Sequence, residues 1–158
     1  MKAIRLFCVA VLGVCLVGIA RAEHDHRHDH ETEAPRQLQL NAGKKWATDA
    51  SLRQSMSGIN QAMAKALPLI HRQQFSDAQY QSLAGSINRQ LAFAIENCKL
   101  ESRADAMLHL VMADLQGGVE AMAGKTAGDR HDGAVQVLHA LKAYGQYFQH
   151  PGWRLARG

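Results

Sequence analysis

The sequence has few cysteines, and their positions leave none for an internal disulfide. Only 3 occur in 158 residues, and Cys8 and Cys15 lie in an N-terminal apolar run that we expect to be removed. Cys98 then stands alone, which excludes a disulfide within the chain even in an oxidising compartment.

Motifs typical of enzymes are also missing. The sequence contains no H-E-x-x-H, no G-x-S-x-G and no Gly-rich phosphate loop. It also lacks the paired E-x-x-H motifs of carboxylate di-iron bundles and the C-x-x-C-H motif of covalently attached haem. We therefore expect a protein that is not an enzyme.

The N-terminus has the three parts of a secretory signal. Met1–Arg5 is basic, Leu6–Ala20 is almost continuously apolar, and Ala20-Arg21-Ala22 matches the pattern that signal peptidase cleaves. The apolar run is shorter than a membrane-spanning helix requires. We predict a cleaved signal peptide over residues 1–22, a periplasmic location and no membrane contact after cleavage.

Cleavage would change the charge of the protein. Loss of Lys2, Arg5 and Arg21 lowers the 18 Lys and Arg residues to 15, against 14 Asp and Glu. The remaining chain is close to neutral when His is uncharged. A nucleic-acid partner is therefore not expected.

A His-rich stretch follows the predicted cleavage site. Residues 23–37 contain little that a core could bury, so we expect a disordered tail in the absence of a ligand. His24, His26, His28 and His30 alternate with Asp25, Arg27 and Asp29. Alternate side chains of an extended chain point the same way, so the imidazoles can converge on one ion. Imidazole suits copper and zinc, and Asp25 and Asp29 are candidate weaker ligands. The alternative is a charged leader that only solubilises the chain.

The rest of the chain, residues 38–158, has apolar residues at helical spacing. The spacing predicts four helices, over about Asp49–Arg72, Asp77–Cys98, Ser102–Gly124 and Asp129–Phe148. Pro68 removes one backbone donor and predicts a kink or an early end to the first helix. The predicted core stripe of the second helix includes Leu91 and Ile95. Short connections then favour an all-α fold, an antiparallel up-down-up-down four-helix bundle.

This topology gathers chemically unusual residues at one end of the bundle, among them Trp46, Met56, Asp105 and Trp153. Cys98, His109 and His150 also fall at that end, and thiolate with imidazole is a ligand set suited to copper or zinc. The alternative is a buried cysteine that packs as a small hydrophobe beside two hydrogen-bonded histidines.

A haem-binding or electron-transfer bundle is a second functional hypothesis. Met56 with His139 or His150 would supply the axial ligands of a b-type haem, although methionine on a helix stripe is ordinarily a core residue. The architecture is similar to cytochrome b562-type bundles. In those the haem histidine stands where this chain has Gly145.

Four further groups of residues carry a resemblance across residues 38–153. They are LNAGKKWATD at 40–49 with Leu52-Arg53 and Met56, NCKL at 97–100, Ala104-Asp105 with Leu108-His109, and YFQHPGW at 147–153. Together they resemble a family of small secreted proteobacterial helical proteins, sometimes labelled DnrO-like, which brings no activity with it. The leading hypothesis is a periplasmic metal-binding protein that handles copper or zinc and passes it to a periplasmic partner protein. The third hypothesis is a structural or interaction module without a metal role.

Overall fold

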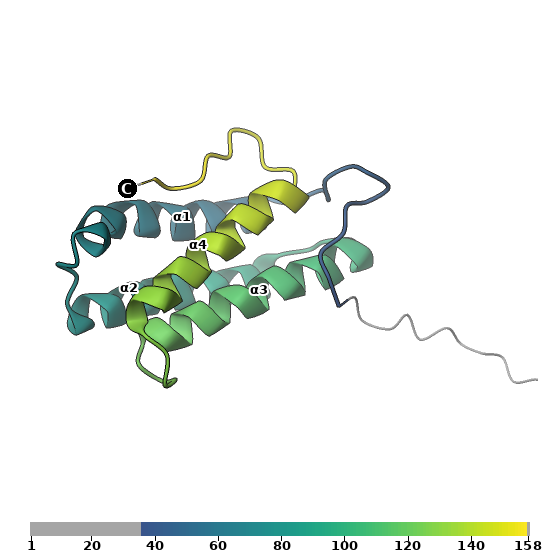
Figure 1. The fold of residues 1–158 in the computed structure, drawn as a ribbon. Coiled ribbons are helices and arrows are strands. Elements are labelled where there is room, and N and C mark those ends of the chain that lie inside the picture. The colour runs from purple at the N-terminus through teal and green to yellow at the C-terminus, as the bar shows by residue number, and fades with distance from the viewer. Residues whose placement is uncertain (1–35, 158) are drawn as a thin grey trace, which may run out of the picture. The chain divides into compact units, whose positions relative to one another are not determined.

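The computed structural model describes residues 36–157. They form an antiparallel bundle of four helices: α1 (Ala50–His71), α2 (Asp77–Asn97), α3 (Ser102–Met122) and α4 (Arg130–Tyr147) (Figure 1). The all-α bundle predicted from the helical spacing is therefore confirmed. Among the described helices, none is long and apolar enough to cross a membrane.

The helix ends follow from local hydrogen bonding. The Asp49 carboxylate accepts the Leu52 N–H at 2.7 Å and caps α1, and Ser76 with Gln79 forms a capping box at α2. Gly124, with a φ of +73°, follows the end of α3. The early end expected at Pro68 is not observed, because α1 continues through it to His71.

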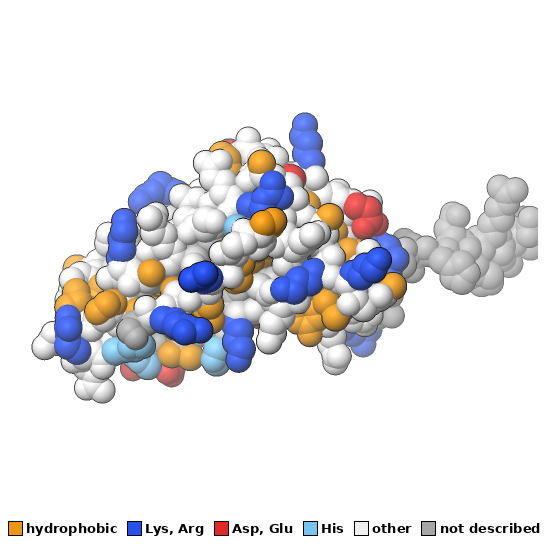
Figure 2. Space-filling model, turned by 90° about the horizontal axis from the view of Figure 1, so that it is seen from above, with side chains coloured by type: hydrophobic (Ala, Val, Ile, Leu, Met, Phe, Trp, Pro, Cys, Tyr) orange, Lys and Arg blue, Asp and Glu red, His pale blue; other side chains and the backbone are white. Residues whose placement is uncertain are grey.

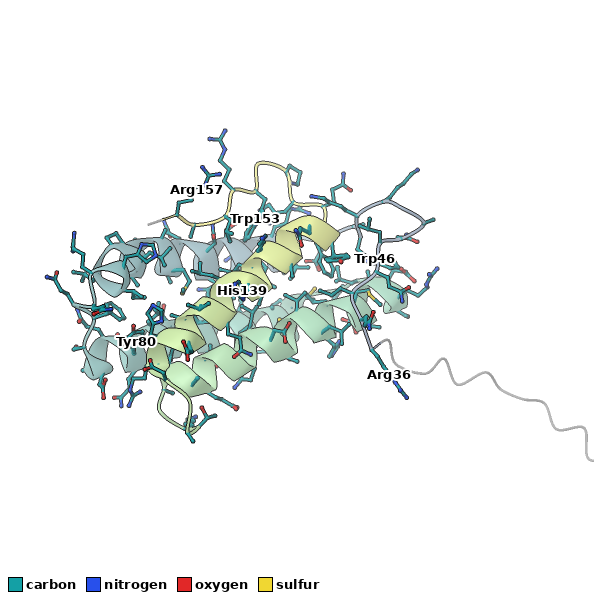
Figure 3. All side chains as sticks on the ribbon, viewed as in Figure 1. Arg36, Trp46, Tyr80, His139, Trp153 and Arg157 are labelled. Carbon is teal, nitrogen blue, oxygen red and sulfur yellow. The ribbon has the colours of Figure 1, made fainter. Side chains whose placement is uncertain are left out.

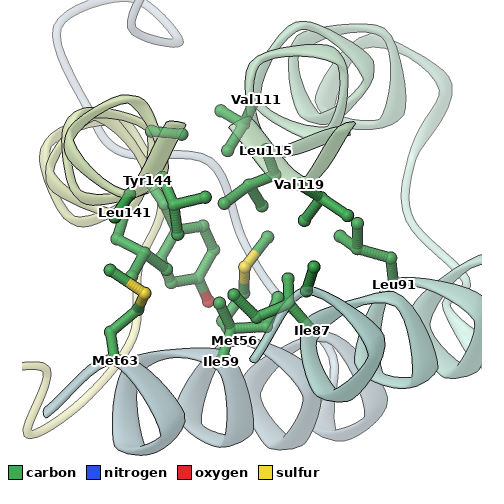
Figure 4. Close-up of a cluster of buried hydrophobic side chains, with 14 of the residues drawn as sticks. Met56, Ile59, Met63, Ile87, Leu91, Val111, Leu115, Val119, Leu141 and Tyr144 are labelled. Atoms are coloured by element: carbon green, nitrogen blue, oxygen red, sulfur yellow. The ribbon is translucent and has the colours of Figure 1, made fainter. Parts of the chain in front are cut away.

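The core lies between the four helices and consists mainly of aliphatic side chains, methionine and Tyr144 (Figure 4). Met56 and Met63 are both completely buried there. The expectation for Ile95 was wrong, since its side chain is 74% exposed while Ala94 is buried. Trp46 and Phe148, which lie outside the four helices, also belong to the core.

The helices do not pack equally closely. α3 and α4 share the largest interface, and the interface between α1 and α4 is much smaller. At the α3–α4 crossing, a Cβ atom added to Gly133 would lie 2.7 Å from the Gly118 carbonyl oxygen, so the two backbones require glycine there. The weak α1–α4 seam is covered by the C-terminal segment, residues 148–157, which folds back along α1 (Figure 1).

Candidate functional site at the base of the bundle

Three segments meet at one end of the bundle, which we call the base, as the topology predicts. The segment before α1 pairs with the end of α4: Trp46 N–H donates to the Tyr147 carbonyl and Gln149 N–H to the Trp46 carbonyl, both at 2.8 Å. The α2–α3 turn joins them through Lys99 N–H, which donates to the Asp49 carboxylate at 2.6 Å. The base is thus a hydrogen-bonded junction of distant parts of the chain.

His150 follows Gln149 on the segment that leaves this junction. Its Nδ1 lies 2.9 Å from the Tyr144 hydroxyl, and its Nε2 lies 3.4 Å from the Ser57 hydroxyl. Burial, and then the positive charge of Arg53, lower the pKa of His150 and favour the neutral ring.

The Tyr144 hydroxyl decides which ring nitrogen carries the hydrogen. Tyr144 is completely buried, and burial raises the pKa of its phenol far above the usual range, so the hydroxyl stays protonated. His150 is its hydrogen-bond partner in the described part of the chain. A protonated phenol with this single partner donates to Nδ1 and leaves the hydrogen of the neutral ring on Nε2.

The C-terminal segment builds a hollow over His150. The chain reverses at Gly152, where φ is +76°, and Asn60 of α1 holds the returning backbone. Its amide donates to the Arg154 carbonyl at 2.9 Å and accepts the Ala156 N–H at 2.8 Å. The resulting hollow, which we call the His150 pocket, has a volume of about 290 Å³. It is lined by Ser57, Asn60, Gln61, His150, Gly152, Trp153 and Arg154. The sequence analysis did not predict this pocket. The Pro151-Gly152 pair, which marks the reversal of the chain, was the sequence feature that pointed to it.

Cys98 lies at the end of α2, half-buried and turned toward Asp49. Burial, and then the charge and hydrogen bond of the Asp49 carboxylate, raise the pKa of the thiol to about 11. The thiolate is the metal-binding form of cysteine, so this environment opposes ligation near neutral pH. Cys98 behaves as a hydrogen-bonded thiol of the base.

His109 lies on the surface of α3, with 74% of its side chain exposed. Its Nδ1 is 2.9 Å from the Asp105 carbonyl oxygen and 3.4 Å from the Asp105 carboxylate. Over residues 36–157, no three or more His, Cys, Asp or Glu side chains are close enough to hold a metal ion. In the described structure Cys98, His109 and His150 each engage a different neighbour, and a joint metal site of the three stays a prediction. His24, His26, His28, His30, Asp25 and Asp29 lie outside the described residues.

The positions considered for haem ligation differ in burial. Met56 is completely buried in the core, whereas His139 is exposed on α4. Gly145 lies directly under the Trp153 indole, and a Cβ added there would collide with its Nε1 and Cδ1 atoms. Trp153 also packs edge-on against Tyr144, with ring centroids 4.9 Å apart. The Trp153 indole, which lies beside α4 in Figure 3, therefore fills the space over Gly145.

Comparisons with protein-family models, with curated proteins and with solved structures found no match to this chain. The functional argument therefore depends on the chemistry of the residues themselves.

Proposed function

We propose that this chain is a non-catalytic metal-binding protein of the periplasm that handles copper or zinc. One observation carries the proposal: His24, His26, His28 and His30 occupy four of seven consecutive positions and alternate with Asp25, Arg27 and Asp29. Imidazole is the preferred neutral ligand for both metals, and the two carboxylates raise the local concentration of cations.

The described domain offers a firm attachment for such a tail. Gln39 N–H donates to the Met107 sulfur at 3.3 Å, and the Trp46 indole N–H donates to the Gln39 carbonyl at 2.6 Å. The chain is therefore held against α3 within a few residues of the His-rich segment. In this proposal the tail captures the ion, the bundle carries the tail, and a periplasmic partner protein receives the metal.

The decisive experiment measures metal in untagged protein isolated from the periplasm, by elemental analysis and then by calorimetric titration. Three forms are compared: the mature chain, a form in which the four tail histidines are replaced by Ser, and a matched control with His109→Gln and His131→Gln. Both control histidines are exposed in the described structure, so their replacement leaves the fold intact.

The expected result is near-stoichiometric copper or zinc in the mature chain and the control, and loss of the metal from the tail variant. Equal metal content in all three forms would overturn capture by the tail, and absence of metal from all three would overturn metal handling. Intact mass tests the location, since a periplasmic protein beginning at Glu23 is expected and a cytoplasmic full-length chain would contradict it.

A further inference from the structure

The charges of the mature domain are divided unevenly between its two helix pairs. Residues 50–76 and 133–157, which hold α1, most of α4 and the C-terminal segment, contain 6 Lys and Arg residues and no Asp or Glu. Residues 77–132, which hold α2 and α3, contain 8 Asp and Glu against 5 Lys and Arg. Figure 2 looks onto the side of the C-terminal segment, where Lys and Arg side chains are spread widely and carboxylates are few. A positive potential over this face follows.

The His150 pocket opens on this basic face. No carboxylate lines it, and exposed Arg154 brings a permanent positive charge to it. Arg53 lies close enough to act electrostatically on the His150 ring. The environment of the pocket is therefore one that attracts an anion.

The polar atoms of the pocket are also matched to an anion. Because the Tyr144 hydroxyl donates to Nδ1, the His150 ring directs an N–H from Nε2 toward Ser57. The 3.4 Å separation from the Ser57 oxygen is long for a hydrogen bond, so an oxygen of stronger charge could replace that partner. The amide of Asn60 is already used by the backbone of residues 154 and 156. The groups left to meet a ligand include the imidazole N–H, the Ser57 hydroxyl and Arg154.

We propose that the His150 pocket binds a small oxyanion of the phosphate or sulfate class, with His150 Nε2–H, the Ser57 hydroxyl and Arg154 as its donors. The pocket volume of about 290 Å³ leaves room for such an anion with some of its water, since one water occupies roughly 30 Å³ in the liquid. This anion site does not depend on metal capture by the tail, so a negative result for one proposal leaves the other unaffected.

The test is a titration of the mature protein with inorganic phosphate, and separately with sulfate, at constant ionic strength set by chloride. Binding is followed by nitrogen-15 NMR of the His150 ring and the Trp153 indole. Saturable shifts of both signals are expected. Arg154→Gln should weaken binding by about tenfold, as for loss of one charged hydrogen bond.

Arg157→Gln is the matched control, because it removes the same charge from the same segment but does not line the pocket. It should change the affinity by less than about twofold, as expected for a screened surface charge. Ser57→Ala provides a second, uncharged test and should also weaken binding. Shifts that never saturate, or equal losses in the Arg154 and Arg157 variants, would show only diffuse attraction to the basic face and would overturn the site. Thermal unfolding of each variant establishes that it is folded.

Discussion

The buried hydroxyl of Tyr144 lies 2.9 Å from Nδ1 of His150, within hydrogen-bond distance. The two residues are 6 positions apart, but the first belongs to α4 and the second to the segment that leaves it. This one bond ties the C-terminal segment to the core and fixes the orientation of the imidazole.

Tyr144→Phe should therefore change both stability and the state of the histidine. Loss of the donor should lower the free energy of unfolding by about 1–2 kcal/mol, since Nδ1 is left without its partner. The His150 ring should also gain a population with its hydrogen on Nδ1, which nitrogen-15 NMR measures directly. Tyr147→Phe, at the half-buried end of α4, serves as the control and should change neither quantity as much. Unchanged His150 nitrogen shifts in Tyr144→Phe would contradict the assigned donor.

Cys98 should react slowly with thiol reagents in the folded protein. With a pKa of about 11, only about a thousandth of the thiol is ionised at pH 8. Asp49→Asn removes the carboxylate that opposes ionisation, so the rate of alkylation at pH 8 should rise several-fold. Asparagine is also a good N-cap, which preserves α1. Asp114→Asn, on the solvent side of α3, should leave the rate unchanged, and an equal rise there would exclude a specific role of Asp49.

Stability should fall when the solution is acidified through the titration range of His150. Burial and Arg53 lower the pKa of His150 in the folded protein below its ordinary value of 6.5. The folded state therefore prefers the neutral ring, so this contribution is complete above pH 6.5 and is lost as the pH decreases below it. Urea unfolding at a series of pH values should show the decrease. His150→Gln should flatten it, whereas His139→Gln should not, and equal slopes in both variants would contradict this origin.

The α3–α4 crossing should not tolerate a methyl group. Gly133→Ala places Cβ 2.7 Å from the Gly118 carbonyl oxygen and 2.8 Å from Cβ of Ala121. Forcing the helices apart should cost about 1–3 kcal/mol of stability. Gly85→Ala is the matched control on α2, where the nearest atom would be 3.9 Å away. There alanine should stabilise by about 0.5–1 kcal/mol, because glycine loses more entropy on folding. Chemical denaturation compares the two, and a Gly133→Ala protein as stable as the original would contradict the close crossing.

Sequence periodicity predicted the helices well but assigned the wrong residue to the buried face at the C-terminal end of α2. The steps from Leu83 to Ile87, Leu91 and Ile95 are each four residues, and each such step advances about 40° around a helix. By Ile95 the stripe has rotated roughly 120° from Leu83, which places it in solvent. Ala94 lies much closer to the original direction and is buried instead. The prediction favoured the long apolar side chain of Ile95 over the small side chain of Ala94.

The site was less predictable because it depends on contacts between distant residues. The topology indicated correctly that Trp46, Cys98 and His150 share the base, since helix order alone decides that. It did not show that the chain turns back at Gly152 and is held by Asn60, a polar residue of α1 with no distinctive sequence context. Helix order also does not determine side-chain orientation: Cys98 turns toward Asp49, and His109 turns toward its own helix.

The position of Trp46 and Trp153 has a consequence for how unfolding is observed. They are the only 2 tryptophans in the sequence, and both lie toward the base, Trp46 under the Arg103 guanidinium and Trp153 over Gly145. Intrinsic fluorescence therefore reports on one end of the bundle. Unfolding of the helix ends next to the α1–α2 and α3–α4 turns would leave the emission unchanged while circular dichroism recorded the lost helix. A difference between the two signals during denaturation would measure how independently the far end opens.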